Sequence, residues 1–299
     1  MPNKIFLVIK KKTKPKHALW AVLALLVLAI TNIGVLAQPY SPSAVRDIGI
    51  KFARASSGEH QISYAYSGNT DKIGLLFIHG TPGGWGAFEL YLENKQLQQD
   101  FFMVSVDRIG WGASPLALKD VDGNFDLQVK TINAVMESYP DKKWILIGHS
   151  LGASIAPKIA LTNPDAVADL LLLAGSLKPS LGGPRWYNRA ASTLVIANLI
   201  GKQMRRSNRE IMGLRKQLAI MDKEIKSSQL STRLTLMQGG KDKLVSPKNS
   251  DYVRNNWAEN FASVEIIYLE EEGHFLPWRQ ARRVVETLYR LSARTQQFN

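Results

Sequence analysis

Short apolar runs alternate with longer amphipathic stretches along most of this 299-residue chain. The run at 73–78 is almost unbroken, which is typical of a parallel strand buried on both faces. Similar runs follow at 102–106, 144–147, 169–173, 234–237 and 264–269. Residues 45–52 and 61–67 instead alternate apolar and polar side chains with the period of half-exposed strands, and no helical stretch separates them. These two segments predict an antiparallel hairpin at one edge of the sheet.

Helical spacing of apolar side chains marks the segments between the later strands. We expect helices over residues 85–98, 126–139, 150–162, 249–256 and 276–293. A repeated order of strand, helix and strand is typical of the α/β class. The pattern therefore predicts a doubly wound, mostly parallel sheet of eight strands with helices on both of its faces.

Residues 178–230 interrupt this rhythm, because they contain no convincing strand. Their apolar side chains recur at helical spacing in two groups: Leu194, Ile196, Leu199 and Ile200, then Ile211, Met212, Leu214 and Leu218. We interpret the segment as a helical cap, a lid over the ends of the strands. The core domain then comprises residues 44–177 and 231–295. The alternative is a set of ordinary outer helices.

The first 37 residues have the pattern of a targeting segment. A basic run from Lys10 to Lys16 precedes thirteen consecutive apolar residues, and small residues lead to a potential cleavage site after Ala37. These are the parts of a signal peptide. Residues 18–37 are also barely long enough to span a bilayer, so an uncleaved anchor with cytoplasmic lysines is an equal alternative. Both interpretations place the core domain outside the cytoplasm: periplasmic, extracellular or held at the cytoplasmic membrane.

The formal charge of +13 is unevenly distributed along the chain. Residues 1–37 hold six lysines and no acid, and residues 178–226 hold eleven Lys or Arg against three acids. The remainder is close to neutral, which argues against a dispersed nucleic-acid-binding surface. The basic cap suits an anionic membrane surface or an anionic substrate, but a solvated face without a partner is the simpler interpretation. The oligomeric state is not indicated.

Candidate chemistry begins at Gly148-His149-Ser150-Leu151-Gly152. The motif follows one predicted strand and opens one predicted helix, as a nucleophile elbow requires. Its glycines remove side chains that would clash in the sharp turn, and the helix N-terminus points unpaired N–H groups at developing negative charge. Ser150 is therefore the candidate nucleophile. The chain has no cysteine, which excludes disulfides, thiolate metal sites and a cysteine nucleophile.

A serine hydroxyl needs a base, and His274 is the best-placed histidine. It lies between the last predicted strand and the last predicted helix, where the chain order of serine, acid and histidine requires it. The four other histidines lie in the targeting segment, on the hairpin, at a strand end or beside the serine: His17, His60, His79 and His149.

The acid that orients this base is predicted to be Asp242, which follows the strand at 234–237. The loop after the preceding strand offers no acid. The run from Glu270 to Glu272 is the alternative, but it lies too close to His274 in sequence and suits a solvated turn. Asp107, in a polar loop rich in glycine, is expected to be a structural hydrogen-bond acceptor.

Acyl transfer also needs donors for the oxyanion of the tetrahedral intermediate. The glycine-rich loop His79-Gly80-Thr81-Pro82-Gly83-Gly84 directly follows the strand at 73–78. We expect the backbone N–H groups of Thr81 and Leu151 to be the donors, because Leu151 follows the nucleophile and Pro82 has no N–H. The alternative is a simple turn.

Five motifs in this order resemble the α/β-hydrolase superfamily over about residues 45–295. They are His79-Gly80-x-Pro82-Gly83, Asp107-Arg108-x-Gly110-x-Gly112-x-Ser114, Gly148-His149-Ser150-x-Gly152, Gly240-x-Asp242 and Gly273-His274. The resemblance is to capped members: esterases, carbon–carbon bond hydrolases and enzymes similar to proline iminopeptidase. It implies a triad of Ser150, Asp242 and His274 with Thr81 and Leu151 as oxyanion donors.

The same resemblance separates branches of the superfamily. Haloalkane dehalogenases and epoxide hydrolases carry Asp at the elbow, whereas this chain has Ser150. Proline iminopeptidases usually have Gly-Gly-Pro-Gly after the first histidine and Trp after the serine, whereas Thr81 and Leu151 stand here. We therefore expect hydrolysis of an ester, thioester or related acyl bond of a small molecule, without a metal or cofactor. The alternatives are an aminopeptidase, a carbon–carbon bond hydrolase or a non-catalytic binding protein on this fold.

Overall fold

A computed structural model describes residues 49–121 and 123–296 of the chain. The predicted signal peptide or anchor, residues 1–37, lies outside the described residues. Among the helices of the described part, none is long and apolar enough to cross a bilayer.

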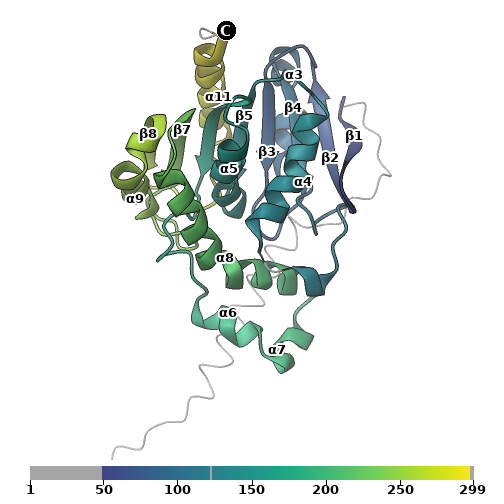
Figure 1. The fold of residues 1–299 in the computed structure, drawn as a ribbon, viewed down its shortest axis with the longest axis vertical. Helices are drawn as coiled ribbons and strands as arrows, with labels where there is room; N and C mark the ends of the chain where they lie inside the picture. The colour runs from purple at the N-terminus through teal and green to yellow at the C-terminus, as the bar shows by residue number, and fades with distance from the viewer. Residues whose placement is uncertain (1–48, 122, 297–299) are drawn as a thin grey trace, which may run out of the picture. The chain divides into compact units, whose positions relative to one another are not determined.

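The eight strands form one sheet in the order β1-β2-β4-β3-β5-β6-β7-β8. Their bounds are β1 Lys51–Ser57, β2 His60–Gly68, β3 Gly74–Ile78, β4 Phe102–Val106, β5 Trp144–His149, β6 Val167–Leu173, β7 Leu230–Gly239 and β8 Phe261–Leu269. Strand β2 runs antiparallel to β1 and β4, and all other neighbours are parallel. The predicted mostly parallel sheet with an edge hairpin is thus confirmed (Figure 1).

The first strand lies later in the chain than the sequence pattern predicts. We expected it at 45–52, of which residues 45–48 lie outside the described part, whereas β1 begins at Lys51 and ends at a two-residue turn before β2. Gly58 opens this turn with φ of 60°, a conformation that glycine adopts without a steric penalty. Most of β1 is exposed at the sheet edge, so little burial marks it in the sequence.

Helices cover both faces of the sheet. Their bounds are η1 Trp85–Phe88, α2 Glu89–Leu92, α3 Lys95–Asp100, η2 Leu118–Asp120, α4 Phe125–Glu137, α5 Leu151–Thr162, α9 Asn249–Asn256, η3 Ala258–Asn260, α10 Leu276–Arg279 and α11 Ala281–Gln296. The prediction of a single helix at 85–98 is wrong, because the helical segment is interrupted at Asn94. The Oδ1 atom of Asn94 accepts hydrogen bonds from the N–H groups of Gln96 and Leu97 and so starts α3 as a new helix.

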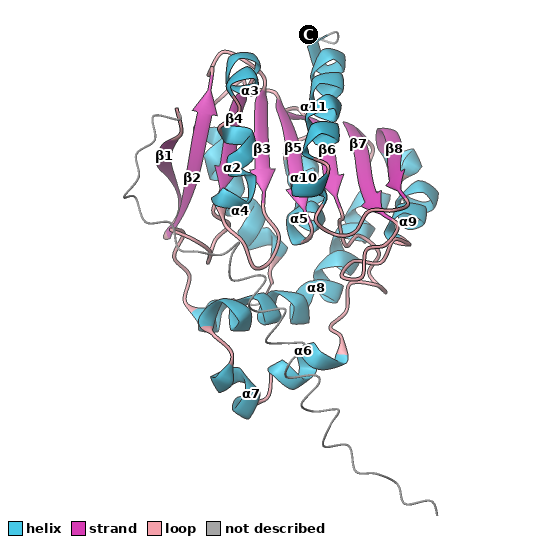
Figure 2. Cartoon of the chain, turned by 180° about the vertical axis from the view of Figure 1, so that it is seen from behind, coloured by secondary structure: helices cyan, strands magenta, loops and turns pink. Residues whose placement is uncertain are grey.

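Two hydrophobic cores lie on opposite faces of the sheet. Along β3, Leu76 and Ile78 belong to the core under α4 and α5, whereas Leu75 and Phe77 belong to the core under α2 and α11. Figure 2 shows α2, α10 and α11 in front of the sheet and α4 and α5 behind it. The near-continuous apolar run of this strand follows from burial on both sides.

The segment between β6 and β7 is helical. It contains α6 Trp186–Ala191, α7 Leu194–Leu199 and α8 Lys202–Lys226. Helix α8 buries one apolar stripe against the core: Leu214, Leu218, Met221 and Ile225. Figure 2 shows these helices beyond the ends toward which the parallel strands point. The expected helical insertion is therefore present at the carboxyl edge of the sheet.

The centre of the sheet brings two loops together at this edge. Strands β3 and β5 are neighbours with Ile78 opposite Gly148, although β4 intervenes in sequence. The order of strands reverses here, and such switch points are where ligands bind in open α/β sheets. The loops that follow β3 and β5 are the predicted oxyanion loop and the predicted elbow.

Candidate active site

Ser150 occupies a sharp turn between β5 and α5. Its backbone has φ of 54° and ψ of −116°, which side-chain-bearing residues adopt only under strain. The N–H of Ser150 donates to the Leu173 carbonyl over 2.9 Å, which ties the turn to the end of β6. This geometry is the expected strand-to-helix elbow.

The elbow glycines are required by close packing. A Cβ on Gly152 would lie 2.0 Å from the Ile78 carbonyl oxygen, and one on Gly148 would lie 2.6 Å from the Ala153 backbone. Neither backbone contact can move without shifting β3 or α5. The turn can therefore form only because both positions lack side chains.

Asp242 and His274 come together from the loops after β7 and β8. The Nδ1 atom of His274 lies 2.8 Å from Asp242 Oδ2. The other carboxylate oxygen, Oδ1, accepts the N–H groups of Leu244 and Val245, each at 2.8 Å. One oxygen thus holds the loop while the other meets the histidine ring, which fixes the orientation of both side chains.

The environment of Asp242 favours its ionised form. Burial raises the pKa of this carboxyl, but the His274 hydrogen bond and the N–H groups of Val245 and Leu244 outweigh it and lower the pKa below its ordinary value. A carboxylate that accepts from Nδ1–H leaves Nε2 of His274 with its lone pair free to take a proton. The predicted alternative acids lie elsewhere: Glu271 pairs with Lys241, and Glu272 accepts from Arg279 and Gln280.

Two further histidines support the site without joining the pair. The Nε2 atom of His149 lies 3.0 Å from the His274 carbonyl oxygen, to which it donates. Burial and the neighbouring His274 lower the pKa of His149 to about 3. Burial and Arg108 likewise hold the pKa of His79 well below its usual value. Both rings are therefore neutral at ordinary pH and serve as hydrogen-bonding groups.

The predicted oxyanion loop packs against the elbow. A Cβ on Gly80 would lie 2.9 Å from the Ser150 Cβ, so only a glycine lets the loop come this close. In the described part of the chain, neither the Thr81 N–H nor the Leu151 N–H donates to a backbone carbonyl. Both N–H groups are therefore available to an added oxygen.

The structure joins some of the predicted residues and leaves one contact open. Asp242 and His274 are hydrogen bonded, and Gly80 touches Ser150. Among the described residues, no hydrogen bond joins the Ser150 hydroxyl to the His274 ring. Catalytic hydrogen bonds often tighten only when substrate is bound. The roles of these side chains in catalysis stay predictions.

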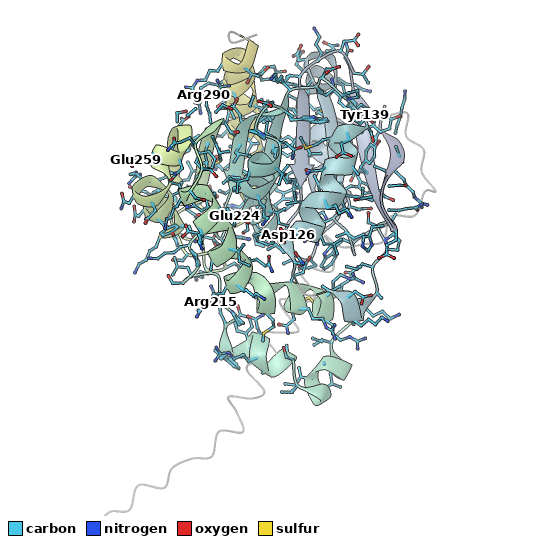
Figure 3. All side chains as sticks on the ribbon, viewed as in Figure 1. Asp126, Tyr139, Arg215, Glu224, Glu259 and Arg290 are labelled. Atoms are coloured by element: carbon cyan, nitrogen blue, oxygen red, sulfur yellow. The ribbon has the colours of Figure 1, made fainter. Side chains whose placement is uncertain are left out.

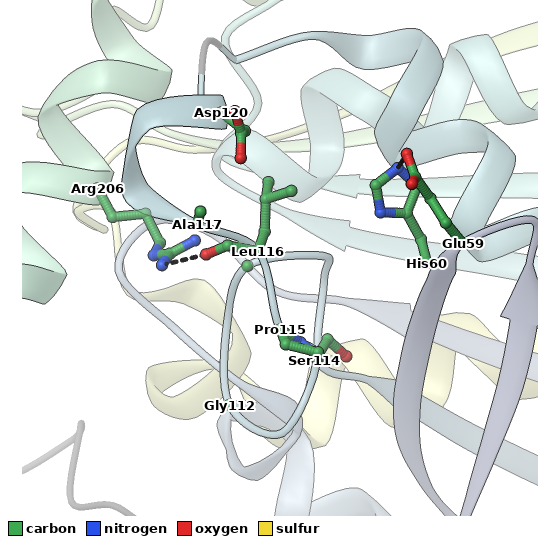
Figure 4. A pocket seen from close by; sticks show the side chains of 10 residues that line it. Glu59, His60, Gly112, Ser114, Pro115, Leu116, Ala117, Asp120 and Arg206 are labelled. Atoms are coloured by element: carbon green, nitrogen blue, oxygen red, sulfur yellow. Dashed lines mark hydrogen bonds and ion pairs between the residues drawn. The ribbon is translucent and has the colours of Figure 1, made fainter.

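Asp107 is the structural acceptor that the sequence suggested. Its two carboxylate oxygens accept the N–H groups of Trp85 at 2.8 Å and Ala113 at 2.9 Å. A pocket shown in Figure 4 is lined by residues that include Gly112 and Ser114 of this loop. None of the predicted triad residues lines this pocket. There Arg206 donates to the Leu116 carbonyl over 2.9 Å.

Sequence reasoning missed a buried ion pair next to the site. Arg108 is fully buried and lies 2.8 Å from Glu210, which comes from α8 of the cap. One signal was available in the sequence: Glu210 is the first acid after a stretch, 178–209, that holds seven Lys or Arg and no Asp or Glu. A lone acid at the end of such a stretch is a candidate partner for a buried cation.

Known proteins resemble this chain in part of its sequence and in its fold. Residues 75–195 match the family model described as alpha/beta hydrolase fold. Over 134 residues the chain is 34% identical to the proline iminopeptidase of Neisseria gonorrhoeae, a match covering 44% of this chain and 41% of that enzyme. Over 138 residues it is 30% identical to the (lyso)-N-acylphosphatidylethanolamine lipase of Bos taurus, covering 43% and 40%. The chain thus spans less than half the length of these curated relatives.

Solved structures extend the likeness to most of the chain. Epoxide hydrolase I of potato superposes with a TM-score of 0.64 at 15% identity, covering 82% of this chain and 99% of that one. An epoxide hydrolase from Vigna radiata gives a TM-score of 0.66 at 12% identity, covering 84% and 100%. Identity this low shows a shared fold alone. The strand order, the elbow and these matches together show that the chain has the alpha/beta hydrolase fold.

Proposed function

We propose that this protein is a serine hydrolase that cleaves an ester, thioester or related acyl bond of a small molecule. Ser150 is the nucleophile, His274 the base and Asp242 the acid that orients the base. The observation that carries the proposal is the 2.8 Å contact between Asp242 and His274, at the sheet edge where the Ser150 elbow lies. The proposed chemistry requires no metal ion or cofactor.

The proposed acylation step uses Ser150, His274 and the two N–H donors. Nε2 of His274 takes the proton of the Ser150 hydroxyl as Oγ bonds to the carbonyl carbon of the substrate. The carbonyl oxygen becomes an oxyanion, which accepts from the N–H groups of Thr81 and Leu151; each such donor lowers the barrier by about 3–4 kcal/mol. The tetrahedral intermediate then collapses, and the leaving alcohol or thiol departs with the proton from His274.

Deacylation repeats the same steps with water. His274 takes a proton from water as the water oxygen bonds to the acyl carbon. The second tetrahedral intermediate collapses, the bond to Ser150 Oγ breaks, and Oγ recovers the proton from His274. The products are a carboxylic acid and the free enzyme, so one water is consumed in each cycle.

The charge of the cap favours a neutral or anionic substrate over an amino-terminal amine. Residues 178–209 contain no carboxylate, and the carboxylate of Glu210 is engaged by Arg108 and Trp111. A substrate ammonium group would find no free acid in this part of the chain. This argues against the aminopeptidase alternative suggested by the similarity to proline iminopeptidase.

We further propose that the protein acts outside the cytoplasm at a membrane surface. The basic run and apolar stretch in residues 1–37 support export or anchoring. The cap supports contact with anionic lipid, because Trp186 is 65% exposed and Leu199 is 78% exposed within the acid-free stretch 178–209. Apolar side chains flanked by cations suit the interface of an anionic bilayer.

Activity assays with the full chain test the proposed reaction. The substrates are p-nitrophenyl esters of increasing acyl length and aminoacyl arylamides that include the prolyl compound, with Ser150→Ala as the control. We expect wild type to hydrolyse the esters and Ser150→Ala to be inactive. Preference for an arylamide would instead favour the aminopeptidase, and equal rates for wild type and Ser150→Ala would contradict the proposal.

A further inference from the structure

Arg108 is a fully buried cation that the proposed triad does not use. It follows β4, and its guanidinium contacts two carbonyl oxygens and one carboxylate. Nε donates to the His79 carbonyl and Nη2 to the Gly80 carbonyl, each at 2.9 Å. Nη1 and Nη2 donate to the two oxygens of Glu210 at 2.8 and 3.2 Å. Each of the three guanidinium nitrogens thus donates to either the oxyanion loop or the cap.

The Gly80 carbonyl is the decisive contact, because it shares a peptide unit with the Thr81 N–H. It accepts from Arg108 Nη2 and from His79 Nδ1, the latter at 2.7 Å. The ring of His79 is held in this tautomer, since its Nε2 accepts the Arg108 N–H at 3.1 Å. In a trans peptide the carbonyl and the N–H point in opposite directions. Two donors on the carbonyl therefore fix where the Thr81 N–H points.

The charge of Arg108 adds to this alignment. A cation at the oxygen end of an amide polarises the peptide unit and strengthens its N–H as a donor. The same loop touches the elbow at Gly80. Arg108 thus both orients and polarises the Gly80–Thr81 peptide through its carbonyl oxygen. The Thr81 N–H is therefore a preorganised donor, as oxyanion stabilisation requires.

The partner of Arg108 belongs to the cap. Glu210 lies on α8, its side chain is 2% exposed, and it also accepts the Trp111 indole N–H at 3.1 Å. The backbone of Glu210 packs on Gly123, where a Cβ would lie 2.7 Å from its carbonyl oxygen. Glu210 is therefore held both at its carboxylate and at its backbone.

We propose that Arg108 and Glu210 are positioning residues through which cap helix α8 sets the Thr81 oxyanion donor. This rests on the proposed serine hydrolase function and adds a coupling to it. A cap that carries Glu210 away leaves Arg108 without its counterion, so that of the two donors on the Gly80 carbonyl only His79 keeps its place. The Thr81 N–H is then fixed by both donors only while α8 is seated on the core.

The test compares two acids of α8 in ester hydrolysis. Glu210→Gln removes the charge that holds Arg108. Glu224→Gln is the matched control, because Glu224 also joins α8 to the core, through Lys158 Nζ at 3.0 Å, and does not touch the loop. Figure 3 labels Glu224 on α8 and Asp126 on α4, the two acids that Lys158 joins.

We expect Glu210→Gln to lower kcat about tenfold while KM changes less than about twofold, because a misaimed donor costs part of what a lost one does. Binding of a boronic acid, which forms a tetrahedral adduct on serine, should weaken about as much as kcat falls. Glu224→Gln should keep kcat within about twofold of wild type. An equal loss of kcat in both variants would contradict the proposal, since it would reflect cap attachment alone.

A double variant covers the case in which Glu210→Gln does not fold. Arg108→Met with Glu210→Leu replaces the pair by apolar side chains, an exchange that buried ion pairs often tolerate. It should keep a cooperative melt and still lose about tenfold in kcat. A folded double variant with wild-type kcat would overturn the inference while leaving the proposed function intact. A wild type that hydrolyses no ester would contradict the proposed function and this inference with it.

Discussion

Ser150 holds a backbone conformation that costs about 1–3 kcal/mol, and its surroundings explain how it is kept. The preceding strand, the following helix and a hydrogen bond to the Leu173 carbonyl fix it from three sides. Strain retained at one serine, at the same sheet edge as a histidine–carboxylate pair, is typical of a functional residue. Hydrogen bonds of single residues also show why Asp242 is preferred as the acid. Its Oδ2 atom contacts His274 directly, whereas Glu271 pairs with Lys241 and Glu272 with Arg279.

Replacing Asp242 tests this choice of acid. Asp242→Asn keeps the shape of the side chain but removes the charge and favours the wrong tautomer of His274. We expect kcat for ester hydrolysis to fall by about 10⁴-fold, as for the matching change in serine proteases. Turnover close to that of wild type would show that another acid orients His274.

His149 makes a prediction about pH and stability. Its pKa is about 3 in the folded state, because of burial and the nearby His274, against about 6.5 for an unfolded histidine. Below about pH 6.5 this histidine binds a proton in the unfolded chain but stays neutral in the folded chain. It therefore lowers the free energy of unfolding as the pH falls from about 6.5 toward 3. Wild type should therefore lose up to about 2 kcal/mol more than His149→Asn between about pH 7 and pH 5.

Urea unfolding of both proteins at the two pH values measures this difference. Asn offers an N–H group to the His274 carbonyl but does not titrate, which makes it the appropriate comparison. The same pH dependence in wild type and His149→Asn would show that His149 already binds its proton in the folded state.

At the scale of elements, periodicity predicted the sheet but not every boundary. Continuous apolar runs identified β3 and β4 with little error, because both are buried on both faces. The helix expected at 85–98 breaks at the Asn94 cap, a local hydrogen bond that a hydrophobic pattern does not reveal. The exposed edge strand β1 was misplaced because few of its residues are buried.

The residues of the candidate site likewise fall into those that the sequence predicts and those that it does not. The positions of Ser150, His274 and Asp242 at one edge of the sheet could be predicted, because each follows a parallel strand. The Arg108–Glu210 pair joins residues 102 positions apart in sequence. No spacing rule links β4 to the cap, so only the folded chain reveals the contact.

The elbow packing predicts a large effect of one methyl group. Gly152→Ala would place its Cβ 2.0 Å from the Ile78 carbonyl oxygen, so β3 or α5 must move. We expect a loss of at least about 2 kcal/mol in the free energy of unfolding. Gly86→Ala is the control, because a Cβ there meets nothing within 4 Å. Thermal melts of both variants measure the effect on stability. A similar small loss of stability in both would mean that the elbow is loosely packed.

At the scale of the whole molecule, charge and exposed apolar side chains gather on the cap. Residues 178–209 hold seven Lys or Arg and no acid, and of the large apolar side chains whose exposure is described, Trp186 and Leu199 are the two most exposed. Because the chain has no cysteine, one introduced thiol can carry a single environment-sensitive dye. Leu199→Cys reports on this surface, and Ile220→Cys, 40% exposed later on α8, is the matched control.

We expect the dye at position 199 to brighten and shift to the blue with vesicles of anionic phospholipid. Neutral vesicles, or anionic vesicles in high salt, should have little effect, because the attraction is electrostatic. The dye on Ile220→Cys should not respond. An equal response at both positions, a response to neutral vesicles, or a shift that depends only on protein concentration would contradict membrane contact through the cap.

The central claim is that Ser150 is an activated nucleophile. Incubation of the full chain with a fluorophosphonate, followed by peptide mass spectrometry, tests it most directly, because only a serine with a working base is phosphonylated readily. We predict one adduct per chain, located on Ser150, and none on Ser150→Ala. An unlabelled wild type, or equal labelling of wild type and Ser150→Ala, would contradict the claim.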